Sequence, residues 1–252
     1  MSSEILEKAL AGERVTDDEA LALLKSRDLV SVGRVANELR NRKHDPERVT
    51  FIIDRNLNYT NICKTDCDFC AFYRSPGDTR EGYLLPKPVI FKKIEETLAS
   101  GGTGVLMQGG HHPDLGVDYY EDLFASIKAR YPIHLHALSP SEIVHAARRS
   151  KVPRETMPTS FDYLLTQAVS RIYLDNVDHI QSSWVTQGMK IGQVALEFGA
   201  DDLGSIMIEE NVVSAAGTTY RASTDDFVRT IRGLGKIPVQ RDTLYREVRV
   251  WN

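Results

Sequence analysis

The stretch of sequence that decides the fold runs from Val49 to Cys70 and reads VTFIIDRNLNYTNICKTDCDFC. Its first five residues are apolar or β-branched, which predicts a buried β-strand over residues 49–53. This strand leads into a polar loop that holds all three cysteines of the chain, Cys63, Cys67 and Cys70. Reactive side chains that follow a buried strand are typical of sites at the carboxyl ends of parallel strands. We therefore expect an α/β protein with its site in this loop.

Helical and strand-like patterns alternate beyond the loop. Apolar spacing predicts helices over residues 90–98, 119–130, 141–148, 159–173 and 189–198, and strands over residues 104–107, 133–138, 177–181 and 204–208. Strands separated by helices imply parallel βαβ units. With the strand at 49–53, the count is about five parallel strands, whereas a closed (β/α) barrel needs eight. The pattern predicts a partial or open (β/α) barrel.

The two ends of the chain differ from this middle region. Residues 1–48 read as a helical N-terminal extension, with a capping box formed by Thr16 and Glu19. Residues 49–213 form the predicted partial barrel, with a cluster loop at 55–75. Residues 214–252 predict a helix that begins near Ser223 to Asp226, ends at Gly233 or Gly235, and is followed by an extended tail.

Composition excludes several functional classes. The 252 residues are 42% hydrophobic and 26% charged, with a formal net charge of -4, which is typical of a globular protein. The absence of a Lys/Arg block argues against nucleic acid or an anionic membrane as a partner. No apolar run approaches the roughly 20 residues that span a bilayer, and residues 1–8 do not resemble a signal peptide. These features predict a cytoplasmic protein.

The spacing of the cysteines, C-x₃-C-x₂-C, points to a metal centre. An odd number of clustered cysteines does not make a disulfide framework. Three thiolates can hold three irons of a [4Fe–4S] cluster and leave the fourth iron open. S-adenosylmethionine can chelate that iron through its amine and carboxylate. The alternative is zinc, which requires a fourth protein ligand at short spacing, and no histidine lies between Asp45 and Met107.

Three further residues are candidates for contact with the cofactor. Phe69, directly before the last cysteine, could pack against the adenine of the cofactor, or it could be an ordinary packing residue. Gly109 and Gly110 follow the strand at 104–107, where missing side chains permit a ligand to approach the backbone. On this hypothesis a larger residue at Gly110 would weaken cofactor binding and leave the metal centre intact. An ordinary glycine turn is the alternative.

Candidates for substrate contact are weaker. His111 lies in the same turn and could face a substrate or simply be solvated. Glu209 and Asn211 follow the strand at 204–208 and could line a site or form an acidic turn. His134 and His136 share one face of their strand, which points either into the barrel or outward under a helix. No proton acceptor can be singled out.

Residues 55–113 resemble the radical S-adenosylmethionine superfamily, whose hallmark is C-x₃-C-x-aromatic-C. More narrowly, QGGHHP at 108–113, SIMIEENVV at 205–213 and VQRDTLY at 239–245 resemble the cyclic dehypoxanthinyl futalosine synthase family of menaquinone biosynthesis. The resemblance implies a [4Fe–4S] cluster on the three cysteines and S-adenosylmethionine at Gly109 and Gly110. It also implies cyclisation of dehypoxanthine futalosine, a small molecule, with electrons from a flavodoxin or ferredoxin.

The resemblance has alternatives and one departure. Aminofutalosine synthase and the deazaflavin-forming radical enzymes are near relatives, and a non-catalytic iron–sulfur-binding remnant is a further alternative. Members of these families are longer than this chain. The shortfall falls near residues 150–154 and removes the fourth to sixth barrel strands, which predicts exposed sheet edges and poor activity.

Overall fold

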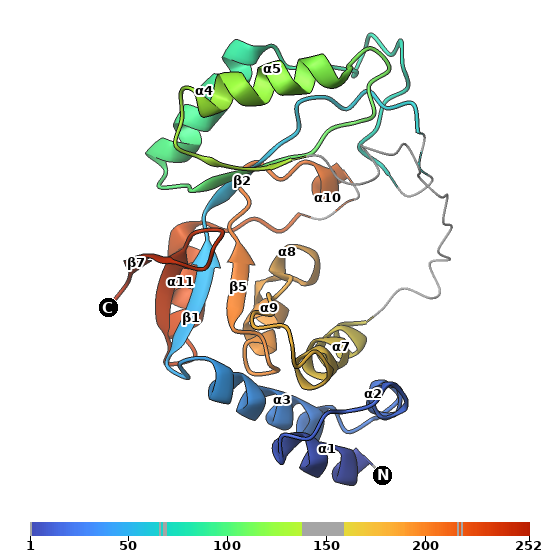
Figure 1. Cartoon of the computed structure of the whole chain (residues 1–252), viewed down its shortest axis with the longest axis vertical. Helices are drawn as coiled ribbons and strands as arrows, with labels where there is room; N and C mark the ends of the chain where they lie inside the picture. The colour runs from blue at the N-terminus through green and yellow to red at the C-terminus, as the bar shows by residue number, and fades with distance from the viewer. Residues whose placement is uncertain (1, 66, 68–69, 138–158, 216, 218) are drawn as a thin grey trace.

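The computed structural model describes residues 2–252 except 66, 68–69, 138–158, 216 and 218 (Figure 1). Three predictions lie outside the described residues: Phe69, the helix at 141–148 and the junction at 150–154. Among the described helices, none combines the length and the apolar character needed to cross a membrane.

The strands form two sheets, which are joined because two consecutive strands follow each other almost directly and act as the two halves of one central strand. Its first half, β1 (Arg48–Ile52), pairs in parallel with β5 (Asp202–Ser205) on one side and β6 (Ile237–Arg241) on the other. Its second half, β2 (Asp54–Leu57), pairs with β3 (Gly104–Met107), and β3 pairs with β4 (His134–Ala137), again in parallel. The final strand, β7 (Glu247–Val250), is antiparallel to β6. In the described part of the chain these strands do not close into a barrel, which agrees with the predicted open (β/α) arrangement.

Each half of the central strand has its own helices and core. The helices α4 (Lys87–Ala99) and α5 (Val117–Lys128) cover β2–β4, with Leu57, Val105 and Met107 beneath them. At β1 and β5, the shorter helices α8 (Trp184–Gln187) and α9 (Met189–Ala195) pack with α11 (Thr224–Arg232) over Phe51 and Leu203. Figure 1 shows these two groups at different heights along the molecule, joined by the β1–β2 strand.

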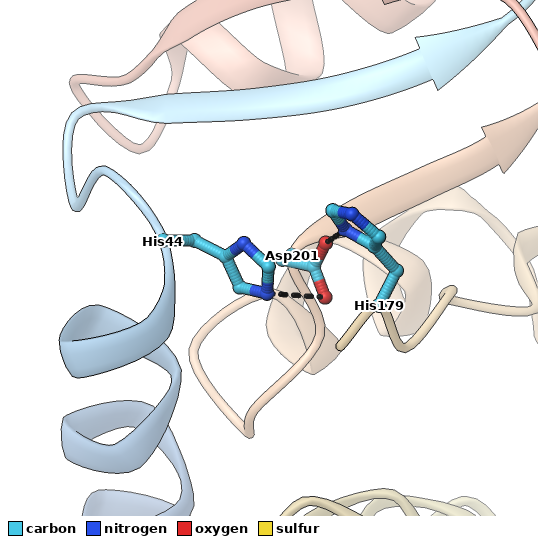
Figure 2. A group of neighbouring side chains, drawn as sticks. All are labelled: His44, His179 and Asp201. Carbon is cyan, nitrogen blue, oxygen red and sulfur yellow. Dashed lines mark hydrogen bonds and ion pairs between the residues drawn. The ribbon is translucent and has the colours of Figure 1, made fainter. Parts of the chain in front are cut away.

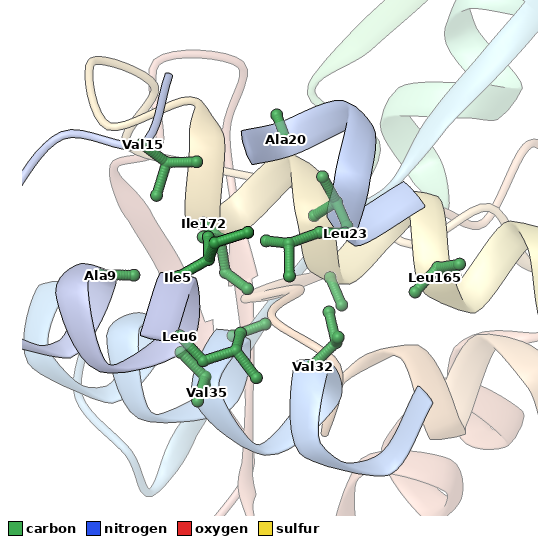
Figure 3. Close-up of a cluster of buried hydrophobic side chains, with 13 residues drawn as sticks. Ile5, Leu6, Ala9, Val15, Ala20, Leu23, Val32, Val35, Leu165 and Ile172 are labelled. Carbon is green, nitrogen blue, oxygen red and sulfur yellow. The ribbon is translucent and has the colours of Figure 1, made fainter. Parts of the chain in front are cut away.

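The N-terminal extension packs against the middle of the chain. Its helices are α1 (Ser2–Leu10), α2 (Asp17–Leu24) and α3 (Leu29–Lys43), and they enclose α7 (Ser160–Tyr173). Leu23 and Val32 are fully buried in this cluster together with Leu165 and Ile172 of α7 (Figure 3). Burying a side chain of this size stabilises the fold by roughly 1.5–3 kcal/mol. The core therefore crosses the expected boundary at 48/49, and the division into three parts stays a prediction.

The observed caps agree with the predicted helix starts. Thr16 and Glu19 form the capping box of α2, Thr159 and Asp162 that of α7, and Ser223 caps α11 through the Asp226 amide. These caps are local interactions between residues three apart, which is why the sequence alone revealed them.

One strand prediction was wrong. Residues 177–181 form only an isolated bridge, between Gln181 and Asp202, and within this range His179 and the Ile180 amide bind the side chain of Asp201. The tail expected to be extended contains the strands β6 and β7, but the sequence did not predict that residues 237–241 pair in parallel with β1. The total of about five parallel strands nevertheless holds when β1 and β2 are counted as one.

Candidate active site

Two loops meet at the carboxyl ends of β2 and β3, and their backbones bind each other. The Gly110 amide donates to the Thr60 carbonyl at 2.9 Å, and the Lys64 amide donates to the His111 carbonyl at 3.1 Å. Within the cysteine loop, the Cys63 amide donates to the Arg74 carbonyl at 2.9 Å. The cysteine loop is thus held by backbone hydrogen bonds from both sides, as a loop at a buried strand end requires.

The paired glycines make this close approach possible. A Cβ atom on Gly110 would overlap the Ile62 carbonyl oxygen and lie 2.8 Å from the Cβ of Cys63. A Cβ atom on Gly109 would overlap the ring of Tyr59, which is 1% exposed. Both missing side chains therefore serve the packing of the cysteine loop. Contact between these glycines and a cofactor stays a prediction.

The three cysteines are half-buried and form no disulfide. Among the described residues, the three sulfur atoms are not one of the groups whose ligand atoms converge tightly enough to share an ion. A four-iron cluster does not need this convergence, because each thiolate binds a different iron. The residues therefore fit a [4Fe–4S] cluster better than a mononuclear zinc site.

Polar side chains line the sheet face that turns away from α4 and α5. Asp54, Gly104 and His134 stand in register across β2, β3 and β4, and Asn56 and His136 stand in the next row. Both histidines are exposed, whereas Leu135 between them packs into the core beneath the helices. The strand pairing thus resolves the open alternative: the histidines lie on the inner face of the open barrel.

Asp54 is a candidate that sequence reasoning missed. It accepts a hydrogen bond from the Ser205 hydroxyl. Burial raises the pKa of its carboxyl above the usual range, and the hydrogen bond from Ser205 opposes this rise. Its one signal in the sequence was its place directly after the apolar run at 49–53; that it shares a row with His134 follows only from the register of β2 with β3 and of β3 with β4.

The residues after β5 lie in different surroundings. Glu209 is bound by cations, because Arg55 donates to it at 2.9 Å and Lys93 also pairs with it. Asn211 instead reaches the inner face and donates to Asn58 at 3.3 Å. A cavity of about 370 Å³ includes Glu209 in its lining but none of the cysteines, so it is not part of the cysteine site. Substrate contacts of Glu209, Asn211 and His111 stay predictions.

At the opposite end of the strands, His44 and His179 lie around Asp201 (Figure 2). This trio resembles a metal site, but its geometry disagrees. The two rings stack with their centroids 4.7 Å apart and their planes inclined by 27°, so the in-plane lone pairs run side by side and do not converge on one ion. Asp201 also already accepts hydrogen bonds from Arg171 at 2.5 Å, the Ile180 amide at 2.7 Å and His179 at 2.6 Å. We assign this group a structural role.

Sequence comparison identifies relatives along nearly the whole chain. The cyclic dehypoxanthine futalosine synthase of Halalkalibacterium halodurans is 35% identical, covering 98% of this chain and 95% of the relative. The enzyme of that name from Streptomyces coelicolor is 34% identical, covering 97% and 88%. The 5-amino-6-(D-ribitylamino)uracil–L-tyrosine 4-hydroxyphenyl transferase of Methanoculleus marisnigri is 28% identical, covering 96% of both.

The alignment with the Halalkalibacterium halodurans enzyme also shows how many positions this chain lacks. It extends over 352 positions, 100 more than the 252 residues of this chain, so at least 100 positions lack a residue here. Because 98% of this chain and 95% of the relative are covered, this difference is mostly internal.

Solved structures agree on the fold. The FeFe-hydrogenase maturase HydG of Carboxydothermus hydrogenoformans superposes with a TM-score of 0.69 at 12% identity, covering 97% of this chain and 80% of HydG. Methylornithine synthase (PylB) superposes with a TM-score of 0.65 at 15% identity, covering 93% and 97%.

Two family models match and together cover most of the chain. The model of the radical SAM superfamily matches residues 57–173, and that of the CofH/MqnC C-terminal region matches residues 145–251. The two matches overlap over residues 145–173, a range that contains the predicted junction at 150–154. Radical SAM membership implies a [4Fe–4S] cluster and S-adenosylmethionine as cofactors. The chain belongs to the radical S-adenosylmethionine superfamily, and within it to the family of the cyclic dehypoxanthine futalosine synthases.

Proposed function

We propose that this chain derives from a radical S-adenosylmethionine cyclase that converts dehypoxanthine futalosine into cyclic dehypoxanthine futalosine on the route to menaquinone. The similarity to two enzymes of that name over 97–98% of the chain carries this proposal. When bound, the cluster and S-adenosylmethionine supply the hydrogen abstraction that starts such a cyclisation. A flavodoxin or ferredoxin as electron donor and a cytoplasmic location belong to the same proposal.

The chain's own residues have distinct tasks in this proposal. Cys63, Cys67 and Cys70 hold three irons. Gly110 lets the loop that follows β3 lie against the cysteine loop. Asp54 is a candidate to accept the proton that the cyclisation releases, because its buried carboxyl has a raised pKa and it lies on the inner sheet face with His134.

Metal analysis tests the cysteine assignment. After anaerobic reconstitution we expect about four irons and four sulfides per chain, with visible charge-transfer absorption. Cys63→Ala, Cys67→Ala and Cys70→Ala should each remove that absorption. Lys64→Ala is the control, since its exposed side chain adjoins Cys63 and is not a candidate ligand. A colourless wild-type protein with stoichiometric zinc would contradict the proposal.

The alignment positions that this chain lacks should affect its catalytic turnover. The described sheet has an exposed inner face at His134 and His136, and β4 is the end of its sheet. We propose that the absent segment lies at residues 150–154 and covers this face in longer relatives. Inserting the corresponding segment of the Halalkalibacterium halodurans relative should raise product formation and sharpen the melting transition. Equal turnover and equal cooperative melting of the short chain would show that the segment is dispensable.

The second candidate function is a tyrosine 4-hydroxyphenyl transferase, favoured by the 28% identity to the Methanoculleus marisnigri enzyme. The same reconstituted protein can be offered either dehypoxanthine futalosine or tyrosine with 5-amino-6-(D-ribitylamino)uracil. Formation of 5′-deoxyadenosine with only one substrate set identifies the function. Its absence with both sets, in a protein that carries the cluster, would indicate a non-catalytic iron–sulfur remnant.

A further inference from the structure

We propose that His111 is a positioning residue that holds Thr65 so that the Thr65 amide donates a hydrogen bond to the sulfur of Cys63. This inference rests on the proposed function, because it assumes that Cys63 is a cluster ligand. It assigns His111 to the cysteine loop, in place of the substrate contact expected from sequence.

Three contacts form the chain of interactions. His111 Nδ1 lies 2.5 Å from the Thr65 hydroxyl. The Thr65 amide donates to Cys63 Sγ at 3.5 Å, within the longer range that sulfur acceptors allow. The His111 carbonyl accepts from the Lys64 amide at 3.1 Å. One residue of the β3 loop thus contacts both residues that follow the first cysteine.

The position of His111 is fixed by its neighbour Gly110. The β3 loop can approach the cysteine loop because Gly110 lacks a side chain, and His111 is the next residue after this closest approach. Thr65 and His111 are both half-buried, so water competes less with their hydrogen bond than it would at the surface. An unanchored Thr65 would be able to rotate its amide away from Cys63.

The amide–sulfur bond gives this contact a chemical consequence. A donor that points at a cluster sulfur stabilises the more negative, reduced cluster, and hydrogen bonds to sulfur are among the factors that set cluster potentials. When no metal is bound, the same bond lowers the nucleophilicity of the Cys63 thiolate. His111 therefore acts on the potential and retention of the cluster through Thr65.

Four variants separate this role from a general packing effect. His111→Ala removes the side-chain contact with Thr65, and His111→Asn restores a hydrogen-bonding group at the δ position. Thr65→Val deletes the hydroxyl and keeps the shape and the amide. His112→Ala is the matched control, because the His112 ring accepts a hydrogen bond from the Asp114 amide and not from the cysteine loop.

The first measurement uses the metal-free protein. Alkylation of each cysteine by iodoacetamide is measured by mass spectrometry at a pH well above the ordinary thiol pKa of about 8.5, so that the reacting thiolate is fully formed in every variant. Cys63 should then react roughly 3- to 10-fold faster in His111→Ala and Thr65→Val, because its thiolate is no longer held by one net hydrogen bond. His111→Asn should return the rate toward that of the wild type, and His112→Ala should leave it unchanged. Equal Cys63 rates in His111→Ala and His112→Ala would overturn the proposal.

The second measurement uses the reconstituted protein. His111→Ala should lower the cluster's reduction potential and accelerate iron loss to a chelator roughly 3- to 10-fold, with partial rescue in His111→Asn. An unchanged reduction potential and an unchanged rate of iron loss would also refute the positioning role of His111. A wild-type protein that takes up no iron would instead contradict the proposed function, while the alkylation result would still decide the role of His111.

Discussion

The two ends of the parallel strands are built on different principles. At the carboxyl ends, backbone hydrogen bonds hold a half-buried cysteine loop against a glycine turn. At the amino end of β5, two buried carboxylates are paired with buried arginines: Asp201 with Arg171, and Asp202 with Arg241. The first arrangement leaves half-buried thiols, whereas in the second the buried charges compensate each other. The comparison teaches that the cysteine loop and the buried charge pairs lie at opposite ends of the strands, as site loops and stabilising contacts do in (β/α) barrels.

The buried charge pair should give the largest effect on stability. Asp201→Asn leaves the Arg171 guanidinium, which is 0% exposed, without its counter-charge. We expect the free energy of unfolding to fall by about 3–5 kcal/mol, measured by denaturant titration, while folded protein still binds iron.

The control for this change is the exposed pair between Arg42 and Glu38. Glu38→Gln should cost at most about 1 kcal/mol. If Asp201→Asn cost no more than Glu38→Gln, or if it removed the iron from folded protein, the division between the two ends would be wrong.

A substitution in the glycine turn should reduce iron binding, whereas Asp201→Asn should not. Gly110→Ala places a Cβ against the Ile62 carbonyl and the Cys63 side chain, so the cysteine loop must shift. We expect a loss of about 1–3 kcal/mol in stability and a clear reduction in bound iron, measured on reconstituted protein. This differs from the expectation from sequence that a larger residue would spare the metal centre.

Gly116→Ala is the matched control, since a Cβ atom there meets nothing within 4 Å. It should retain the iron content of the wild type. Full iron binding by Gly110→Ala would show that the cysteine loop tolerates displacement and that the close approach is not required.

The smallest effect should be a pH dependence at the amino end. Burial, the largest cause, lowers the pKa of His44 below its ordinary value, although Asp201 opposes this. The unfolded chain then binds the proton more readily. Stability is full above the unfolded pKa of about 6.5 and falls as the pH drops through that value toward the folded pKa, by at most about 1.4 kcal/mol per pH unit. His44→Gln should flatten the slope, and a slope unchanged by this substitution would exclude His44 as its source.

Local signals in the sequence were enough to predict the fold class, several helix starts and the iron–sulfur loop. The capping boxes, the apolar run at 49–53 and the cysteine spacing each depend on residues close together in the chain, so composition and periodicity reveal them. They predicted an open α/β sheet and an iron–sulfur loop, and the fold and family agree.

Only the tertiary structure decided which groups meet across long separations. The place of residues 237–241 beside β1 depends on pairing with a strand about 190 residues earlier, and no local pattern encodes that choice. The row of Asp54 with His134 follows from strand register, and His111 meets Thr65 because the loops after β2 and β3 lie side by side. The sequence by itself determined which side chains can do chemistry, and the parallel pairing of β2, β3 and β4 determined which of them share a site, because register alone sets the neighbours on each sheet face.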